Sequence, residues 1–220
     1  MEDWCLCALI PKVHNRTRIV VLRHHMEEPK TTNTARIAGL ALQRFELADW
    51  YPRHPLDVDA LLEGKGRSWV LYPGGTSGDP SREKPDTLVV LDGTWKQARK
   101  MLHHHAPILR LPRWGVPGPA PAVLRLRTSA DPHARSTLEA IADALTVLDG
   151  PDVGEPLREL HTVMVERILK ARGMYPKSAP LHEASEPESE SEPGPEIEAA
   201  LTPPLLDAPP AMRRASGSTR

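Results

Sequence analysis

The segment TLVVLDGTWKQARKML, residues 87–102, decides the fold of this chain of 220 residues. After Thr87, residues 88–91 form an apolar run, which is typical of a strand buried on both faces of a parallel sheet. From residue 95 to about residue 104 the apolar side chains recur at the spacing of an amphipathic helix, with Ala98 and Leu102 on one face. A buried strand that passes through a short polar turn directly into a helix indicates an α/β fold.

The same alternation continues along most of the chain. The predicted strands are residues 18–22, 45–48, 68–72, 87–91 and 123–127. The predicted helices are residues 34–43, 95–104, 137–148 and 156–172. The polar segment between the second and third strands is predicted to be surface loop. The sequence therefore predicts an α/β domain with a mainly parallel sheet and flanking helices.

Composition divides the chain into two parts. The whole chain has 28 basic and 29 acidic residues, a formal net charge of -1. Residues 176–220 hold nine of the 24 prolines, eight acids and four basic residues, so residues 1–175 are mildly basic. A segment rich in Glu, Pro and Ser cannot bury enough apolar surface to offset its ordering entropy. We therefore predict one folded domain, residues 1–175, and a disordered acidic tail, residues 176–220.

The sequence also bears on the compartment in which the protein works. It has no apolar run of about 18 residues and no secretory signal pattern at its start, so we expect a cytoplasmic protein with no membrane partner. Cys5 and Cys7 are too close in sequence to form a useful structural disulfide, which fits a reducing compartment. The two cysteines are then free thiols or metal ligands.

Three polar segments follow predicted strands, at the carboxyl ends where ligands collect in α/β proteins. They are residues 23–33 (RHHMEEPKTTN), 73–79 (PGGTSGD) and 92–95 (DGTW). In the third segment, Thr94 and Gln97 have the spacing of a helix capping box. This leaves the Asp92 carboxylate for another use, with an Asx turn at Gly93 as the alternative.

The helix after this turn has two different faces. Trp95 shares a face with Ala98 and Leu102, so it is predicted either to pack in the core or to line a ligand crevice with its indole edge. The opposite face is basic, and its members are Lys96, Arg99, Lys100 and His103. Such a face is either simply solvated or binds a polyanion such as RNA. The consecutive histidines 103–105 project in different directions around a helix and are not expected to chelate one metal.

Two further segments carry candidate ligand groups. Ser136 and Glu139 have the spacing of a second capping box, at a helix N-terminus whose free amides suit a carboxylate or a nucleotide oxygen. The segment HHMEE, residues 24–28, brings two imidazoles and two carboxylates to a strand end. This composition leaves a metal-dependent hydrolase as a possible function, with the ligands His24, His25, Glu27 and Glu28.

Four segments, taken together and in order, resemble the DTW-domain family of tRNA-uridine aminocarboxypropyltransferases. They are CLCALIP (residues 5–11), RHHMEEPKTTNTARIAGLAL (23–42), LDGTWKQARKML (91–102) and RSTLEAIADAL (135–145). The resemblance implies transfer of the 3-amino-3-carboxypropyl group from S-adenosylmethionine to N3 of a tRNA uridine, with release of methylthioadenosine. It also implies a fold related to the knotted SPOUT class.

The resemblance assigns a role to each candidate residue. The expected catalytic residues are Asp92, Thr94 and Trp95, with Asp92 as the base or orienting group for the weakly acidic uracil imide. The expected donor-binding residues are Pro73, Gly74, Gly93, Ser136, Thr137 and Glu139. The residues expected to contact the substrate RNA are His24, Glu27, Asn33, Lys96, Arg99 and Lys100.

One departure from the family concerns zinc. Family members commonly carry two further cysteines upstream of the Cys-x-Cys pair, in an arrangement that resembles a four-thiolate zinc site. Cys5 and Cys7 would then form one half of such a site. Either the true start of the protein lies upstream, or this protein has lost the zinc.

Two functions other than the transferase and the hydrolase also fit the sequence. An S-adenosylmethionine-dependent RNA methyltransferase would use the same donor but transfer its methyl group. A non-catalytic RNA-binding module or ribosome-associated factor would use the basic helix face without any need for Asp92.

Overall fold

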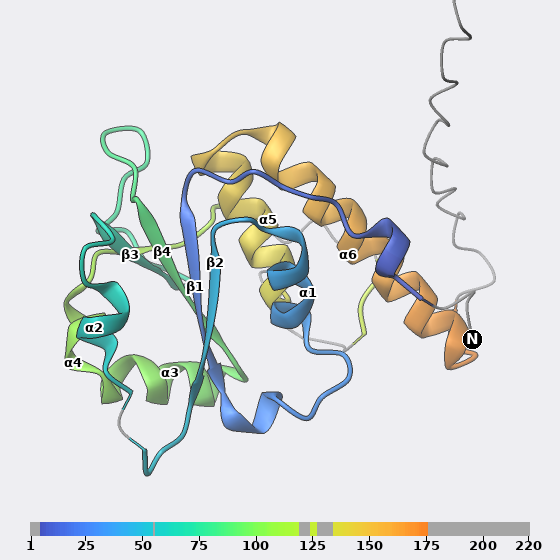
Figure 1. Ribbon diagram of the computed structural model, residues 1–220, viewed down its shortest axis with the longest axis horizontal. Helices are drawn as coiled ribbons and strands as arrows, with labels where there is room; N and C mark the ends of the chain where they lie inside the picture. The colour runs from blue at the N-terminus through green and yellow to red at the C-terminus, as the bar shows by residue number, and fades with distance from the viewer. Residues whose placement is uncertain (1–4, 55, 119–123, 127–133, 176–220) are drawn as a thin grey trace, which may run out of the picture. The chain divides into compact units, whose positions relative to one another are not determined.

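The computed structural model describes residues 5–54, 56–118, 124–126 and 134–175. Within these residues the chain forms a five-stranded sheet, all parallel, in the order β2-β1-β4-β3-β5 (Figure 1). The strands are β1 (Arg18–His24), β2 (Phe45–Trp50), β3 (Ser68–Leu71), β4 (Thr87–Asp92) and β5 (Arg113–Trp114). The predicted α/β class with a parallel sheet is confirmed.

The two central strands are apolar on both faces, as their sequences predict. Val20, Val21 and Leu22 of β1 have no exposed surface, because helices cover the sheet on both sides. The register then places Arg23 of β1 beside Asp92 of β4. The carboxyl edge of the sheet therefore carries buried charged side chains directly after a fully apolar run.

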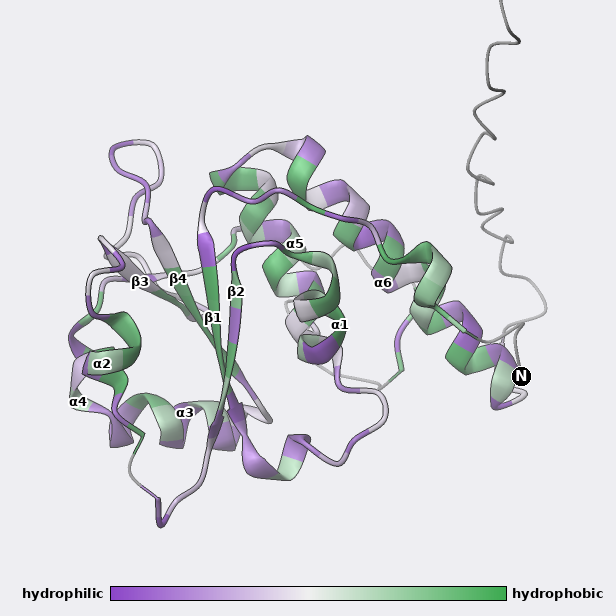
Figure 2. Ribbon diagram, viewed as in Figure 1, coloured by the Kyte–Doolittle hydropathy of each residue, from purple (hydrophilic) through white to green (hydrophobic). Residues whose placement is uncertain are grey.

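Helices cover both faces of the sheet (Figure 1). One face carries α1 (Thr34–Ala41) and α5 (Thr137–Leu148), with α6 (Pro151–Ala171) packed along α5. The other face carries α2 (Val58–Leu62), α3 (Trp95–His104) and α4 (Ala106–Arg110). Two short 3-10 helices occupy Cys7–Leu9 and His25–Glu27. In Figure 2 most of β1 has the colour of hydrophobic residues, and hydrophobic and hydrophilic residues alternate along α6.

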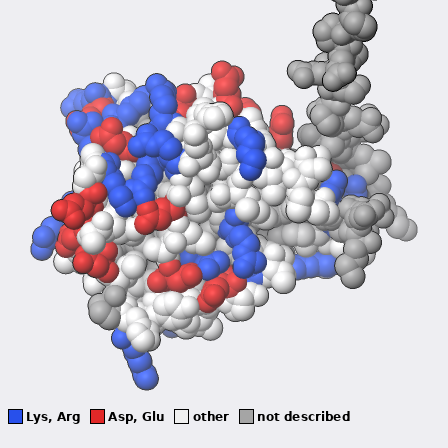
Figure 3. Space-filling view, viewed as in Figure 1, with Lys and Arg blue, Asp and Glu red and all other residues white. Residues whose placement is uncertain are grey.

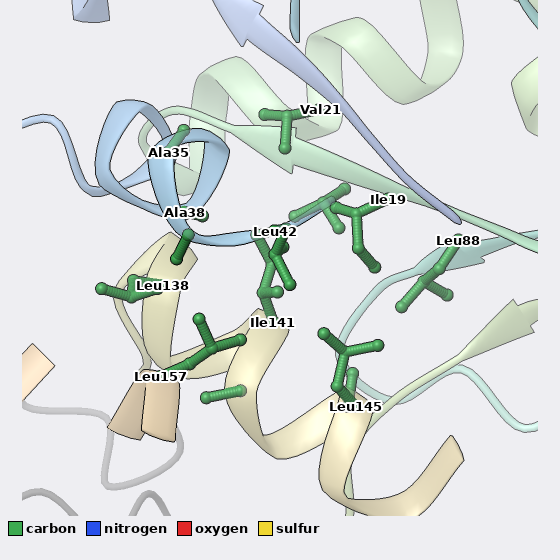
Figure 4. Packing of buried hydrophobic residues seen from close by; sticks show 14 of the residues in the cluster. Ile19, Val21, Ala35, Ala38, Leu42, Leu88, Leu138, Ile141, Leu145 and Leu157 are labelled. Carbon is green, nitrogen blue, oxygen red and sulfur yellow. The ribbon is translucent and has the colours of Figure 1, made fainter. Parts of the chain in front are cut away.

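The larger hydrophobic core lies between the sheet and helices α1 and α5 (Figure 4). Leu138, Ile141 and Leu145 of α5 are fully buried and pack with Ile19 and Leu88 of the central strands. Burial of each such side chain contributes about 1.5–3 kcal/mol relative to leaving it in water. This packing fixes the N-terminus of α5 at the carboxyl edge of the sheet.

Helix α6 approaches α5 closely because Gly154 has no side chain. A Cβ atom at Gly154 would lie 1.9 Å from Oγ1 of Thr146 and 2.5 Å from the carbonyl oxygen of Ala142. Real Cβ atoms do not approach other atoms so closely, so glycine is required here. The close packing brings His161 of α6 to the N-terminus of α5, where its Nε2 lies 2.9 Å from Oγ of Ser136.

The strand predicted at residues 123–127 is wrong over residues 124–126, which form no strand. Residues 123 and 127 lie outside the described residues. Leu124 and Leu126 instead pack toward the buried side of α6. The alternation of apolar and basic residues in this segment therefore reflects packing against a helix. The fifth strand is β5, which pairs with β3. A strand of two residues is too short to give a periodic signal in the sequence.

Other differences concern helices. α2 lies within the segment predicted as loop, and α4 follows α3 directly. α6 begins at Pro151 and not at residue 156, because a proline suits the first turn of a helix. The tail predicted at residues 176–220 lies outside the described residues. Across the described ranges, no helix combines the length and the apolar character needed to cross a bilayer.

Candidate functional site

A cavity of about 210 Å³ lies at the carboxyl edge of the sheet, where the N-termini of α1 and α5 meet the end of β4. Its lining includes seven of the residues singled out in the sequence: Glu27, Asn33, Asp92, Gly93, Ser136, Thr137 and Glu139. These residues come from three separate segments of the chain, 23–33, 92–95 and 135–145. The structure therefore brings most of the predicted acidic residues, and the N-cap residues of α1 and α5, together in this cavity.

Asp92 occupies the centre of this cavity wall. Its side chain is 6% exposed, and one carboxylate oxygen accepts a hydrogen bond from Nδ2 of Asn33 at 2.7 Å. The other oxygen accepts one from Oγ1 of Thr137. Asn33 is also the N-cap of α1, because its Oδ1 accepts from the backbone N–H of Arg36. The amide orientation of Asn33 is therefore set by the helix, and its N–H group is aimed at Asp92.

The surroundings of Asp92 act on its pKa in opposite directions. Burial raises the pKa and is the largest single effect, while the hydrogen bonds from Thr137 and Asn33 lower it. The nearby Glu27 carboxylate raises it further, while the Arg23 guanidinium lowers it. The net direction is upward. A carboxylate with a raised pKa is a better proton acceptor than an exposed one, as a general base requires.

The second cluster in the cavity is the cap of α5. Oγ of Ser136 accepts from the backbone N–H of Glu139 at 3.2 Å, and Oε2 of Glu139 accepts from the N–H of Ser136 at 2.7 Å. The predicted capping box is confirmed. His161 adds a third member, because its Nε2 contacts Oγ of Ser136 and lies 3.7 Å from Oε2 of Glu139. Burial lowers the pKa of His161, which favours the neutral imidazole.

Positive groups also border the cavity. Arg125 and Arg135 line it, and Nε of Arg135 donates to the buried Asp143 at 2.7 Å. Glu27 pairs with Nζ of Lys30 at 2.5 Å. The cavity thus presents carboxylates and guanidinium groups to the same small volume, a combination suited to a ligand that carries both charges.

The two remaining residues of the predicted catalytic group lie elsewhere. Thr94 caps α3, and its capping box with Gln97 is confirmed. Trp95 is 50% exposed and does not line the cavity, so the prediction that it packs in the core is wrong. Its predicted face includes Ala98 and Leu102, which are buried, but the first turn of the helix extends past the edge of the core.

The glycine-rich loop after β3 forms a different hollow. Pro73 and Gly74 line a depression of about 300 Å³ together with Arg113 of β5. Neither residue lines the cavity at Asp92. The donor-binding residues proposed from the sequence are therefore divided between two places, with the larger group at the α5 cap.

The basic residues of α3 face the solvent. Lys96, Arg99 and Lys100 line a shallow hollow of about 450 Å³ with His103 and His104. On the face seen in Figure 3, basic and acidic side chains are intermingled and do not form one large patch of a single sign. The basic face of α3 is therefore a local feature of the surface.

His24 lies on the α3 side of the sheet and not in the cavity. Its ring contacts His25 at 4.6 Å and the buried Trp50 at 5.1 Å between centroids. Burial and the neighbouring His25 lower the pKa of His24. Lys100 lies over the ring of Trp50 at 5.7 Å, so these aromatic groups connect the sheet edge to the basic face of α3.

Metal ligands do not assemble in the described part of the chain. Cys5 and Cys7 are exposed free thiols, and a hydrogen bond from the backbone of Cys7 lowers the pKa of Cys5. Among the described residues, no group of three His, Cys, Asp or Glu side chains is placed to hold a metal ion. Two thiols fall short of the four ligands of a tetrahedral zinc site. The alternative hydrolase ligands in residues 24–28 likewise form no such group among these residues.

Sequence reasoning missed three titratable residues of the cavity, Arg125, Arg135 and His161. His161 occupies a helix position between the buried Leu157 and Met164, a pattern that predicts only a core side chain. Arg125 lies in the strand predicted at residues 123–127, and the sequence predicted no role for Arg135. A lone buried histidine on an amphipathic helix was the available signal, but it does not reveal which cap the imidazole contacts.

Comparison with known proteins gives a consistent result. Residues 1–169 match the DTW domain family. The tRNA-uridine aminocarboxypropyltransferase 2 of Drosophila melanogaster is 30% identical over 173 residues, which cover 73% of this chain and 68% of the relative. Proteins of the same name from Macaca fascicularis and Mus musculus are 22% and 23% identical, over 66% and 80% of this chain and 53% and 68% of their own lengths.

No solved structure matches the chain significantly. The family match, however, spans every residue that lines the cavity. It includes the Asp-x-Thr-Trp core at residues 92–95 and the α5 cap. The chain belongs to the DTW domain family.

Proposed function

We propose that this protein transfers the 3-amino-3-carboxypropyl group of S-adenosylmethionine to N3 of a uridine in tRNA. The family and the names of the relatives support a role in tRNA modification. The observation that carries the proposal is Asp92, a buried carboxylate held by Asn33 and Thr137 at the wall of a small polar cavity.

The reaction requires removal of one proton. The carboxylate of Asp92 takes the proton from N3 of the uracil imide, and the nitrogen lone pair forms a bond to Cγ of the aminocarboxypropyl chain. The Cγ–S bond breaks, and its electron pair stays on sulfur as the sulfonium becomes the neutral thioether of methylthioadenosine. Charge and atoms balance, because the imide proton remains on Asp92 until water removes it.

The donor fits the groups that the cavity offers. S-adenosylmethionine supplies an activated carbon next to a positive sulfonium, together with an ammonium and a carboxylate group. The carboxylates of Asp92 and Glu139 and the guanidinium groups of Arg125 and Arg135 border the cavity. We propose that Gly93, Ser136, Thr137 and Glu139 contact the donor there, and that Pro73 and Gly74 contact it only if it extends to the neighbouring hollow.

The tRNA is proposed to bind across α3. Lys96, Arg99 and Lys100 project from the helix that begins three residues after Asp92, so phosphates on this helix would place a nearby uridine at the cavity entrance. Trp95 has an exposed indole at the start of the same helix, where a displaced base could stack. His24, Glu27 and Asn33 are proposed to border the acceptor uridine.

We also propose that the fold is related to the knotted SPOUT class and that the protein acts in the cytoplasm. The parallel sheet and the flanking helices are compatible with that fold relationship. The proposed mechanism uses neither Cys5 nor Cys7, which are exposed free thiols.

Product analysis tests the proposal. Unmodified tRNA is incubated with the protein and S-adenosylmethionine, the nucleosides are analysed by mass spectrometry, and the small-molecule product is identified. We expect a uridine that carries the aminocarboxypropyl mass and an equal amount of methylthioadenosine. S-adenosylhomocysteine with a methylated nucleoside would indicate a methyltransferase. Binding of tRNA without either product would indicate a non-catalytic factor.

A further inference from the structure

We propose that Glu139 determines donor specificity by accepting a hydrogen bond from the α-ammonium group of the aminocarboxypropyl chain. This inference rests on the proposed function, because it takes S-adenosylmethionine as the donor. It assigns to one oxygen atom, Oε1 of Glu139, the recognition of one nitrogen atom of the ligand.

The first observation is an unused acceptor. The side chain of Glu139 is 5% exposed and lines the cavity beside Asp92. Its Oε2 accepts the cap hydrogen bond from Ser136, but among the described residues no group donates to Oε1. A buried polar atom without a hydrogen-bond partner costs about 1–3 kcal/mol, so native structures keep few of them.

The second observation is that the cap itself does not need the charge. The chain contains two capping boxes, and in the other one a neutral glutamine performs the same task. Oε1 of Gln97 accepts from the backbone N–H of Thr94 at 2.7 Å, the same distance as in the bond from Ser136 to Glu139. Gln97 is half-buried, whereas Glu139 is buried. Of the two capping boxes, the one with the carboxylate is therefore the one where burial makes a charge more costly.

The third observation is a contrast within α5. Asp143 lies one helical turn after Glu139 and is equally buried. It pairs with Arg135 at 2.7 Å and with Arg158, so the fold provides two cations for that carboxylate. Glu139 has His161 at 3.7 Å as its only neighbour within ion-pair distance among the described residues. Burial lowers the pKa of His161, so its imidazole supplies little positive charge at neutral pH.

These three observations define the missing partner. Oε1 of Glu139 can only accept a hydrogen bond, and its charge favours a cationic donor. The sulfonium of S-adenosylmethionine is cationic but carries no N–H or O–H group, so it does not satisfy the oxygen. The α-ammonium group is the part of the donor that provides both the charge and the hydrogen. The guanidinium of Arg125, on the same cavity, suits the adjacent carboxylate of the ligand.

The test measures binding of two ligands by calorimetry. They are S-adenosylmethionine and its analogue in which hydrogen replaces the α-amino group. The wild-type protein should bind S-adenosylmethionine about tenfold to a hundredfold more tightly than the analogue, as expected for a charge-assisted hydrogen bond. The variant Glu139→Gln keeps an oxygen for the cap and removes the charge. It should lose most of this preference by weakening only the binding of S-adenosylmethionine.

Gln97→Glu is the matched control, because it makes the reverse exchange in the other capping box and should leave both affinities unchanged. Equal wild-type affinities for the two ligands would overturn the proposal, even if Glu139→Gln failed to fold. A preference that Glu139→Gln retains would also overturn it, while product formation from tRNA would leave the proposed function standing. If the wild-type protein bound neither ligand and gave no product, the proposed function itself would fail.

Discussion

The two faces of the sheet carry different chemistry at the same carboxyl edge. On the α1 and α5 face, Asp92 lies in a small cavity among polar partners that are themselves held by helix caps. On the α3 face, His24 packs with Trp50 and Lys100, and the surface beyond them is a shallow basic hollow. One face is organised around a buried carboxylate and the other around rings and exposed cations.

This difference follows from the alternation of side chains along a strand. Arg23 and His24 are neighbours in β1, yet they point to opposite faces, as do successive residues of any strand. Gly93 lies where the two faces meet, and a Cβ there would be 3.1 Å from Cβ of Gln97 and 3.4 Å from Cβ of His24. In the proposed function, the donor and the base Asp92 therefore lie on the first face, and the RNA phosphates bind on the second.

The largest expected effect is on the first face. Asp92→Asn should lower the rate of transfer by about 10²–10⁴-fold, the usual contribution of a general base. The amide can still accept from Asn33 and donate to Oγ1 of Thr137, so the cavity should stay intact and both substrates should bind. Single-turnover kinetics with labelled donor measure the rate. Asp59→Asn, at an exposed position on α2, is the control, and equal rates for the two variants would remove Asp92 from the mechanism.

The next effect should appear on the second face. Replacing Lys96, Arg99 and Lys100 together with Gln should weaken tRNA binding and leave donor binding unchanged. The slope of log K against log salt should fall by roughly 0.7–0.9 for each phosphate contact that is lost. Titrations at several salt concentrations measure this slope. Arg82→Gln, an exposed residue that pairs with Asp79, is the control. An unchanged slope in the triple variant would place the RNA elsewhere.

Trp95 allows a sharper test of the same face. Trp95→Ala should reduce tRNA affinity by about 1–3 kcal/mol if a base stacks on the indole, and Trp95→Phe should recover part of the loss. Thermal unfolding should change little, because half of the side chain is exposed. A large fall in melting temperature with unchanged tRNA affinity would show that the indole serves the fold.

The smallest effect is a pH dependence of stability. Burial raises the pKa of Asp92, so the folded protein holds this proton to higher pH than the unfolded chain does. The stabilising contribution of the protonated side chain is complete below the unfolded pKa of about 3.9 and is lost as the pH rises through the folded value.

Urea unfolding of the wild-type protein and Asp92→Asn across this pH range measures the effect. The free energy of unfolding of the variant, minus that of the wild type, should increase as the pH rises. A difference that decreases would mean that the pKa of Asp92 is lowered in the folded protein, and the carboxylate would then be a weaker base than proposed.

Local signals in the sequence predicted the local features of the structure. The apolar run of β4, the two capping boxes and the position of Asp92 after the strand each depend on residues within one short segment. The contacts of Asp92 with Asn33 and Thr137 join residues 59 and 45 positions apart, and no periodicity contains that information. His161 reached the cap of α5 because Gly154 permits close helix packing, a consequence of tertiary structure.

The strand predicted at residues 123–127 and the expected core position of Trp95 failed for a related reason. Both rested on amphipathic patterns, and such a pattern shows that a side of the segment is apolar without showing what covers it. Leu124 and Leu126 pack against a helix, and the first turn of α3 extends beyond the core.

The most direct test of the proposed activity uses doubly labelled S-adenosylmethionine, with one isotope in the methyl group and another in the carboxyl carbon. The labelled donor is incubated with tRNA and the protein, and each isotope is counted in the recovered tRNA. The proposed transfer predicts that the carboxyl label enters the tRNA while the methyl label leaves with methylthioadenosine, and that Asp92→Asn slows the incorporation by about 10²–10⁴-fold. Entry of the methyl label alone, or no label at all, would contradict it.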